Sequence, residues 1–166
     1  IFLDTLTPHF YQFTKRDIMT KSNESVQKSK FNDYYTTSLV YTVKDYNYFI
    51  GIAKNKSFVI YEITKDGRID LKNLVQDGVL DTFHDDLQVV YEPNQGKQFL
   101  ICTNTTESRL DIFTIYANGS IKLFDSLGYK RKSKQGTAIY AANGFFYFYE
   151  QSQRTLEWEI RKFVKE

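Results

Sequence analysis

The chain repeats one pattern in two places, and this pattern is the strongest constraint on its fold. Residues 58–71 and residues 110–123 each begin with a run in which apolar and other residues alternate. Each run is followed by a turn pair, Asp66-Gly67 or Asn118-Gly119, and then by a second short alternating run. Two alternating runs joined by such a pair are the strongest short-range signal of a β-hairpin. The sequence therefore predicts two hairpins of the same kind.

Three similar units follow one another from residue 37 to the end of the chain. They cover about residues 37–80, 86–128 and 136–163 within the segment 37–166. The first two each contain a first hairpin, a polar link and the repeated pattern, so each holds four predicted strands. The third ends with residues 155–163, where alternation predicts a strand and the Glu and Lys content leaves a helix as the alternative. We therefore expect the third unit to lack its fourth strand.

The first hairpins of the three units align residue by residue. Val40-Tyr41, Val90-Tyr91 and Ile139-Tyr140 are equivalent in this alignment, and so are Phe49, Phe99 and Phe145. We expect the hairpin turns of the whole chain to lie near Asp45 to Asn47, Asp66-Gly67, Pro93 to Gly96, Asn118-Gly119 and Asn143-Gly144.

A repeat of about 45 to 50 residues with four strands is typical of the blades of a β-propeller. Residues 37–163 resemble three blades of the WD40-like and lactonase-like propeller superfamily. The runs from Ile60 to Ile69 and from Ile112 to Ile121 resemble the third and fourth strands of a blade. The resemblance implies an all-β, propeller-like fold. Because propellers typically use four to eight blades, three blades imply a partial ring or a ring completed by a second chain.

Residues 1–36 differ from the rest and form a predicted N-terminal extension. We expect a strand between Pro8 and Phe13, which closes the sheet of the last unit unless a second chain supplies further blades. Residues 20–33 are rich in Lys, Ser, Asn and Gln and contain too few large apolar residues to offset the entropy of ordering. The sequence predicts a mobile loop there.

Composition and charge limit the classes of partner and the compartment. Aromatic residues make up 17% of the chain, which favours sheets, and the net charge of +2 indicates no general attraction to DNA or to acidic membranes. No apolar run approaches the ~20 residues that span a bilayer. The single Cys102, which we expect to be buried and inert, and the lack of a signal peptide favour a soluble intracellular protein. Four glycosylation sequons, at Asn23, Asn55, Asn104 and Asn118, keep a secreted protein as the alternative.

No recognisable catalytic or metal-binding motif is present in the sequence. His84-Asp85-Asp86 is the one cluster with acid–base potential, but we interpret it as a solvated loop in which Asp caps a turn. The lactonase-like resemblance implies acidic residues that converge from several blades, for which Asp85, Asp86 and Glu107 are available. We expect no catalytic residue, no metal and no cofactor.

Basic residues of three links are predicted to lie on one face. In the blade register these links present a patch suited to phosphate or to an acidic partner, unless the side chains merely solvate the loops. The candidate binding residues are Lys54, Lys56, Lys130, Arg131, Lys132, Lys134 and Arg154.

The sequence therefore favours a non-enzymatic interaction or scaffold module of β-propeller type that belongs to a larger assembly. The expected partner is another protein or a second copy that completes the propeller. We expect the partner to dock, through an acidic surface of its own, on the face that carries Lys130, Arg131, Lys132 and Lys134. Nucleic acid is not favoured as a partner. The alternatives are a lactonase-like hydrolase and a secreted, glycosylated or glycan-binding propeller protein.

Overall fold

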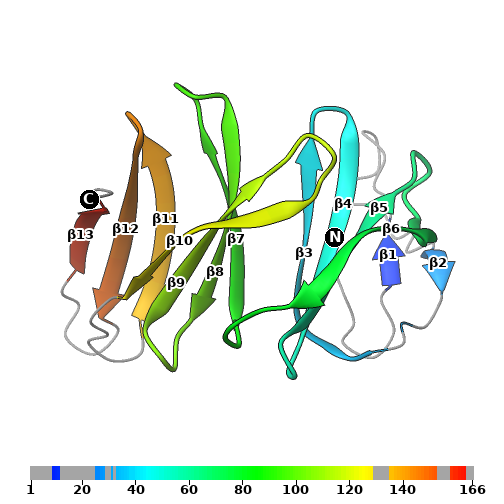
Figure 1. Ribbon diagram of the computed structural model, residues 1–166, viewed down its shortest axis with the longest axis horizontal. Coiled ribbons are helices and arrows are strands. Elements are labelled where there is room, and N and C mark those ends of the chain that lie inside the picture. Colours follow the sequence, from blue (N-terminus) through cyan, green and yellow to red (C-terminus); the bar gives the residue numbers. More distant parts are fainter. Residues whose placement is uncertain are drawn as a thin grey trace. The chain divides into compact units, whose positions relative to one another are not determined.

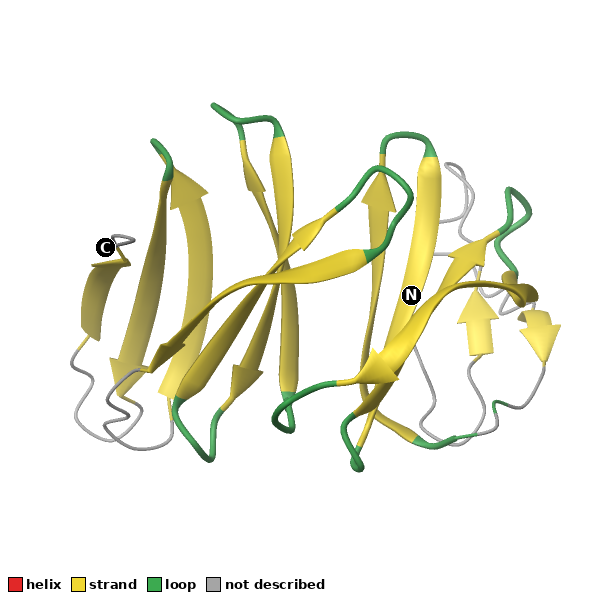
Figure 2. Ribbon diagram, viewed as in Figure 1, coloured by secondary structure: helices red, strands yellow, loops and turns green. Residues whose placement is uncertain are grey.

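The protein is built from β-strands joined by turns and links. The computed structural model describes residues 9–11, 25–28, 31, 33–128, 135–152 and 158–163. Every regular element in these ranges is a strand, and the strands form antiparallel sheets (Figure 2). Within them, no helix is long and apolar enough to cross a membrane. The all-β prediction is confirmed. The chain divides into two compact units, the first unit (residues 1–83) and the second unit (residues 84–166), and the second unit contains the last two of the three predicted repeats.

The first unit contains a four-stranded sheet and a two-stranded sheet. The larger sheet runs in chain order through β3 (Tyr35–Val43), β4 (Tyr46–Ala53), β5 (Ser57–Ile63) and β6 (Ile69–Val79) (Figure 1). The smaller sheet pairs β1 (His9–Tyr11) with β2 (Ser25–Lys28). β2 lies inside residues 20–33, so this part of the predicted loop is a strand. The closing role of the segment from Pro8 to Phe13 stays a prediction.

The second unit contains two sheets, which also follow chain order. One consists of β7 (Asp86–Glu92), β8 (Lys97–Asn104), β9 (Arg109–Ile115) and β10 (Ile121–Gly128). The other consists of β11 (Gln135–Ala142), β12 (Phe145–Ser152) and β13 (Trp158–Phe163). β13 confirms the predicted strand over the helical alternative. The last sheet has three strands among the residues that are described, as the sequence predicts.

The two turns of the repeated pattern have the same geometry. In the first, the Thr64 N–H donates to the Arg68 carbonyl oxygen at 2.7 Å, and the Gly67 N–H donates to the Thr64 carbonyl oxygen at 2.9 Å. Tyr116 and Gly119 make the corresponding bonds in the second turn, both at 2.9 Å. The φ angles of the two glycines are 82° and 81°, in the left-handed region that glycine adopts without strain. Both predicted turns are therefore confirmed.

The other turns lie at or next to their predicted positions. Residues 93–96 join β7 to β8, and Asn143-Gly144 joins β11 to β12 with positive φ at both residues, as a two-residue hairpin loop requires. The first turn consists of Lys44 and Asp45. Tyr46 and Asn47, which we predicted to be in that turn, already belong to β4.

One predicted equivalence is wrong. Phe49 pairs with Val40 and Phe99 pairs with Val90, but the residue that pairs with Ile139 is Phe148. Phe145 follows the turn directly and pairs with Ala142. The sequence alignment placed the first aromatic residue after the turn in the equivalent position, whereas the pairing register places the fourth residue there.

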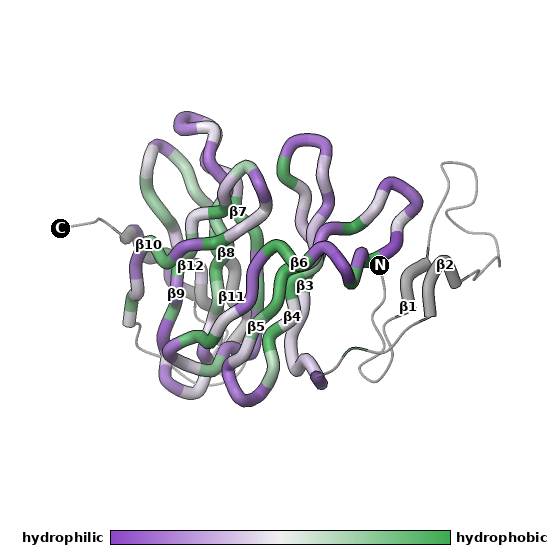
Figure 3. The backbone as a smooth tube through the Cα atoms, turned by 45° about the vertical axis from the view of Figure 1, so that its right-hand side comes forward, coloured by the Kyte–Doolittle hydropathy of each residue, from purple (hydrophilic) through white to green (hydrophobic). Residues whose placement is uncertain are grey.

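The core of each unit is centred on the second strand of its sheet. In the first unit Phe49, Ile63 and Ile69 form a buried cluster, and the Phe31 ring stacks on Phe49 with centroids 5.2 Å apart. Hydrophilic stretches of the chain concentrate at the turns and links (Figure 3). Burial of apolar side chains on the middle strands therefore stabilises each sheet.

The two sheets of the second unit pack face to face. Phe148 of β12 is 1% exposed and joins a buried cluster formed by residues of β7, β8 and β9. Burying a side chain of this size contributes about 2–3 kcal/mol. Two polar contacts add to this packing, since the Ile139 and Gly144 N–H groups of the last sheet donate to Gln88 and Glu92 at 3.3 Å each.

The turn at residues 93–96 provides a test of the hairpin geometry. Gly96 has a φ of 62°, and a Cβ atom added there would meet nothing within 4 Å. Gly96→Ala therefore adds only backbone strain, and we expect it to lower the free energy of unfolding by about 1 kcal/mol. Gly128→Ala is the matched control, because Gly128 has the same open space without a left-handed φ. Equal losses in chemical denaturation of the two variants would contradict this explanation.

Candidate functional site

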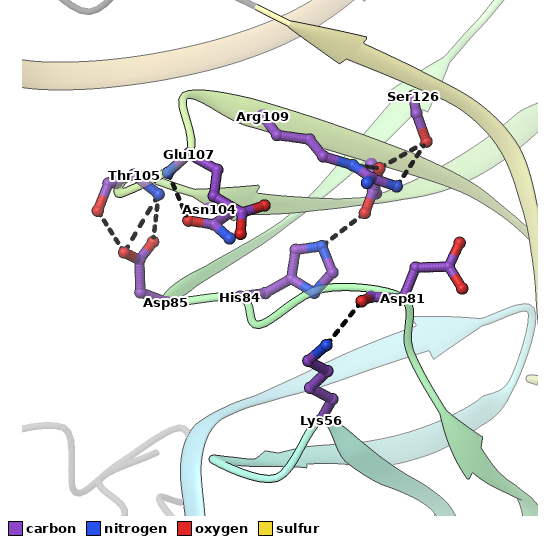
Figure 4. A network of polar contacts seen from close by, with 10 residues as sticks. Lys56, Asp81, His84, Asp85, Asn104, Thr105, Glu107, Arg109 and Ser126 are labelled. Atoms are coloured by element: carbon purple, nitrogen blue, oxygen red, sulfur yellow. Dashed lines mark hydrogen bonds and ion pairs between the residues drawn. The ribbon is translucent and has the colours of Figure 1, made fainter.

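A buried polar cluster lies where the second unit begins. His84, just before β7, is 0% exposed, and its Nε2 lies 2.8 Å from Oδ2 of Asp111 on β9 (Figure 4). The other carboxylate oxygen, Oδ1, accepts hydrogen bonds from Arg109 Nε at 2.8 Å and from Ser126 Oγ at 2.6 Å. The cluster therefore connects the start of the sheet to its third and fourth strands.

The Asp111 carboxylate is strongly stabilised in its charged form. Burial alone would raise its pKa, but the hydrogen bonds from His84, Ser126 and Arg109 and the charge of Arg109 outweigh this effect and lower the pKa to about 2. Arg109 is partly exposed, so its guanidinium neutralises the buried carboxylate and still reaches water. Asp111 is thus a buried anion with a complete set of donors.

The geometry of the cluster gives it a structural role. In a nucleophile–histidine–carboxylate arrangement, the histidine contacts the nucleophile through one ring nitrogen and the orienting carboxylate through the other. Ser126 donates to the carboxylate instead, and the buried His84 Nδ1 has no hydrogen-bond partner among the described residues. The interpretation of His84 as part of a solvated loop is wrong, because its partner lies 27 positions away in the sequence and the pair is buried.

The acidic residues suggested by the lactonase-like resemblance make separate local contacts. Asp85 accepts hydrogen bonds from the N–H of Thr105, at 3.2 Å, and from its hydroxyl, so it caps the β8–β9 link (Figure 4). Asp86 accepts a hydrogen bond from Gln88 at 3.1 Å, and the Glu107 N–H donates to Asn104. The part of the chain that is described contains no His, Cys, Asp and Glu group that could hold a metal ion.

Only two members of the predicted basic patch fall within the described residues. Lys54 and Lys56 are exposed in the link between β4 and β5. The Lys56 ammonium donates to the Asp81 carbonyl oxygen at 2.9 Å, which fixes the segment after β6 (Figure 4). The remaining five residues of the patch lie outside the described ranges: Lys130, Arg131, Lys132, Lys134 and Arg154. The patch stays a prediction.

The cysteine and the sequons differ in accessibility. Cys102 is buried, as expected, and burial together with the nearby Asp111 and Asp86 carboxylates raises the pKa of its thiol well above its usual value. Among the sequons, Asn55 and Asn118 are exposed at turns, whereas Asn104 is buried and cannot accept a glycan in the folded protein. Asn23 lies outside the described residues.

The outer strands β6, β10 and β13 carry an unusual surface. Each is the last strand of its sheet, and together they hold every exposed large aliphatic residue and the one strongly exposed Phe of the described chain. The remaining exposed large hydrophobic residues are tyrosines, whose hydroxyl groups tolerate water. We give these six residues, three in the first unit and three in the second, the collective name outer-strand surface: Leu71, Leu74, Val79, Leu123, Phe124 and Ile160. The sequence predictions above do not include this surface, although the repeated Leu residues of β6 and β10 are a signal of it.

Comparison with known proteins gives no assignment. No protein-family model matches the chain, and no curated protein matches it significantly.

The role of the buried cluster can be tested by removing the charge of Asp111. Asp111→Asn leaves Arg109 without its counter-ion and weakens three hydrogen bonds, so we expect it to lower the free energy of unfolding by about 3 kcal/mol. Asp66→Asn is the control, because Asp66 pairs with Arg68 at the surface and contributes far less. Urea denaturation of both variants measures the difference. A loss no greater for Asp111→Asn than for the control would refute the structural role.

The same carboxylate predicts how stability depends on pH. Its pKa falls from an ordinary 3.8 to about 2 on folding, so the stabilisation is complete above pH 4 and is lost as the pH falls towards 2. The loss amounts to about 2 kcal/mol. We expect the free energy of unfolding of the unmodified protein to fall by this amount more than that of Asp111→Asn over this range. Parallel acid curves for the two proteins would show that Asp111 is not responsible.

Proposed function

We propose that the protein is a non-enzymatic interaction module of β-propeller type and that it functions as part of a larger assembly. The observation that carries the proposal is the outer-strand surface. In each unit, aliphatic side chains exposed on the last strand of a sheet are an incentive for association, because covering them removes apolar area from water. Single exposed residues scattered over the chain would not carry this argument.

The consecutive sheets support the propeller element of the proposal. Three antiparallel sheets follow one another in chain order, and two of them close their last hairpin with the same turn. In the second unit, neighbouring sheets pack through their faces, which is how successive blades bury their apolar surfaces. Units that depend on their neighbours leave an uncovered face at the ends of the series.

The chemistry of the polar residues favours binding over catalysis. The histidine and carboxylate that lie closest together are buried and engaged with each other. The acidic residues named for a hydrolase are instead used to cap a link or to contact neighbours on their own sheet. This arrangement supports a scaffold, whose function resides in its surface.

A second copy of the chain is the partner to test first. The net charge of +2 opposes self-association only weakly, and the outer strands of a second copy offer a matching apolar surface. We expect the unmodified protein to self-associate at micromolar concentration in sedimentation velocity. The double variant Val79→Lys with Leu123→Lys should be monomeric and fold normally, because charges at exposed positions change stability by less than about 1 kcal/mol.

Tyr116→Lys is the matched control for the double variant. Tyr116 is about as exposed as Leu123, but it lies in a turn and outside the outer-strand surface. This variant should associate as the unmodified protein does. An unmodified protein that remains monomeric at tens of micromolar, or a control that dissociates as fully as the double variant, would reject self-assembly through the outer strands.

A further inference from the structure

A small pocket lies inside the second unit, where the β7–β8 turn, β10 and the β11–β12 turn meet. Its volume is about 80 Å³, enough for a group the size of two or three water molecules. Four phenylalanines line it, Phe99, Phe124, Phe145 and Phe146, together with carboxylate residues Glu92 and Asp125. Aromatic walls with a few polar groups are typical of small-ligand sites.

Glu92 leaves this pocket with an unbalanced negative charge. The residue is 2% exposed, and its carboxylate accepts hydrogen bonds from the Gln95 N–H at 2.6 Å and the Gly144 N–H at 3.3 Å. Both donors are neutral, and no cation of the described chain forms an ion pair with Glu92. A buried carboxylate without a counter-ion is costly, and a cation bound in the pocket would remove that cost.

The aromatic walls include rings that lie edge-to-face with one another. The Phe99 ring meets Phe146 edge-to-face at a centroid distance of 5.0 Å and an angle of 86°, and it meets Phe124 at 5.6 Å and 62°. Crossed rings of this kind present faces in several directions, and each face attracts a positive charge. One ring of the lining already has a cation over it, since the Lys162 ammonium lies 3.5 Å from the Phe145 ring centroid.

A β-bulge places the outermost of these rings. Leu123 pairs with Phe113 and Asp125 pairs with Ile112, so Phe124 is the extra residue of β10. A bulge interrupts the alternation of side chains and redirects the residue that it contains. Phe124 thereby reaches Phe99 and the pocket while remaining 42% exposed, which leaves the pocket with an edge open to solvent.

We propose that this pocket binds a small alkylammonium group, with Glu92 and Asp125 as counter-charges and the four phenylalanines as cation–π walls. The volume admits the terminal methylene and ammonium of an amine and excludes a large ring system. Such a group belongs to a lysine side chain of another protein or to a free amine. The inference goes beyond the proposed assembly through the outer strands and does not depend on it.

The test uses n-butylammonium and its uncharged counterpart 1-butanol as probes, titrated into the full chain and followed by two-dimensional NMR. We expect n-butylammonium to shift resonances of pocket residues and to bind at least about tenfold more tightly than 1-butanol, because only the cation compensates Glu92. Equal binding of the two probes would show a merely apolar pocket. Absence of binding up to 50 mM n-butylammonium would also overturn the proposal.

Two variants and one control locate the effect. Glu92→Gln keeps the shape of the side chain but removes the charge, and it should weaken n-butylammonium binding about tenfold or more while 1-butanol binding stays unchanged. Phe124→Leu removes one aromatic wall at an exposed position and should weaken binding of the cation two- to fivefold, on the order expected for one cation–π contact. Tyr91→Ala, at an exposed position of β7 outside both the pocket and the outer-strand surface, should have no effect. A loss for Tyr91→Ala equal to that for Phe124→Leu would place binding elsewhere.

A third probe identifies the source of the ammonium group. Lysine with its amino terminus acetylated and its carboxyl terminus amidated carries the same terminal group as n-butylammonium. Tighter binding of the blocked lysine supports a lysine of a protein partner, and tighter binding of n-butylammonium supports a free amine. Binding of neither probe would reject the site, whether or not the protein self-associates.

Discussion

Burial of the second strand on both faces is the requirement on which the rest of this structure depends. In β4 and β8 the last six residues are all buried, although successive side chains of a strand point to opposite faces. Each four-stranded sheet therefore needs a cover on either side. In the second unit the next sheet supplies one of these covers through Phe148, and the strands become more exposed towards the outer strand β10. The gradient from the buried second strand to the exposed outer strand follows from this packing.

Two buried carboxylates of the second unit, those of Asp111 and Glu92, differ in whether the chain supplies a counter-ion. Asp111 lies opposite Cys102 in the β8–β9 register and receives three side-chain donors, one of which is a guanidinium. Glu92 receives two backbone N–H groups and no cation from the described residues. Both anions are hydrogen-bonded, as burial demands, but only Asp111 has its charge neutralised within the chain. The first arrangement neutralises the charge of the carboxylate within the chain, whereas the second leaves it without a counter-ion among the described residues.

The sequence predicted the features that depend on neighbours in the chain. Turn pairs such as Asn118-Gly119 and Asn143-Gly144 were placed correctly, because a left-handed turn requires particular residues and those residues are local. The alternation of residues 158–163 correctly favoured a strand, since the period of a strand is also local. Because the turns between strands are short, consecutive strands pair with each other, and each sheet follows the order of the chain. The fold class could thus be read from local pattern.

The features that depend on distant residues were not predictable in the same way. His84 looked like part of a polar loop because its partner Asp111 belongs to a strand two hairpins later. The pocket was missed because the position of Phe124 depends on a one-residue bulge, which alternation in the sequence does not reveal. Phe145 was assigned the position that Phe148 holds, because several aromatic residues follow one another in β12. Pairing register and burial decide such positions, and neither is local.

The outer strands combine protection of the backbone with exposure of side chains, and this combination favours one kind of contact over another. Both β6 and β10 contain register shifts, and each carries a lysine, Lys72 or Lys122, among its exposed residues. Bulges and lysines on an edge strand interfere with the regular pairing of a further strand. Yet the same strands expose Leu74, Val79 and Leu123 to solvent. An edge that resists strand addition but presents aliphatic side chains is suited to packing against another surface, so association through side-chain contacts fits these strands better than extension of the sheet.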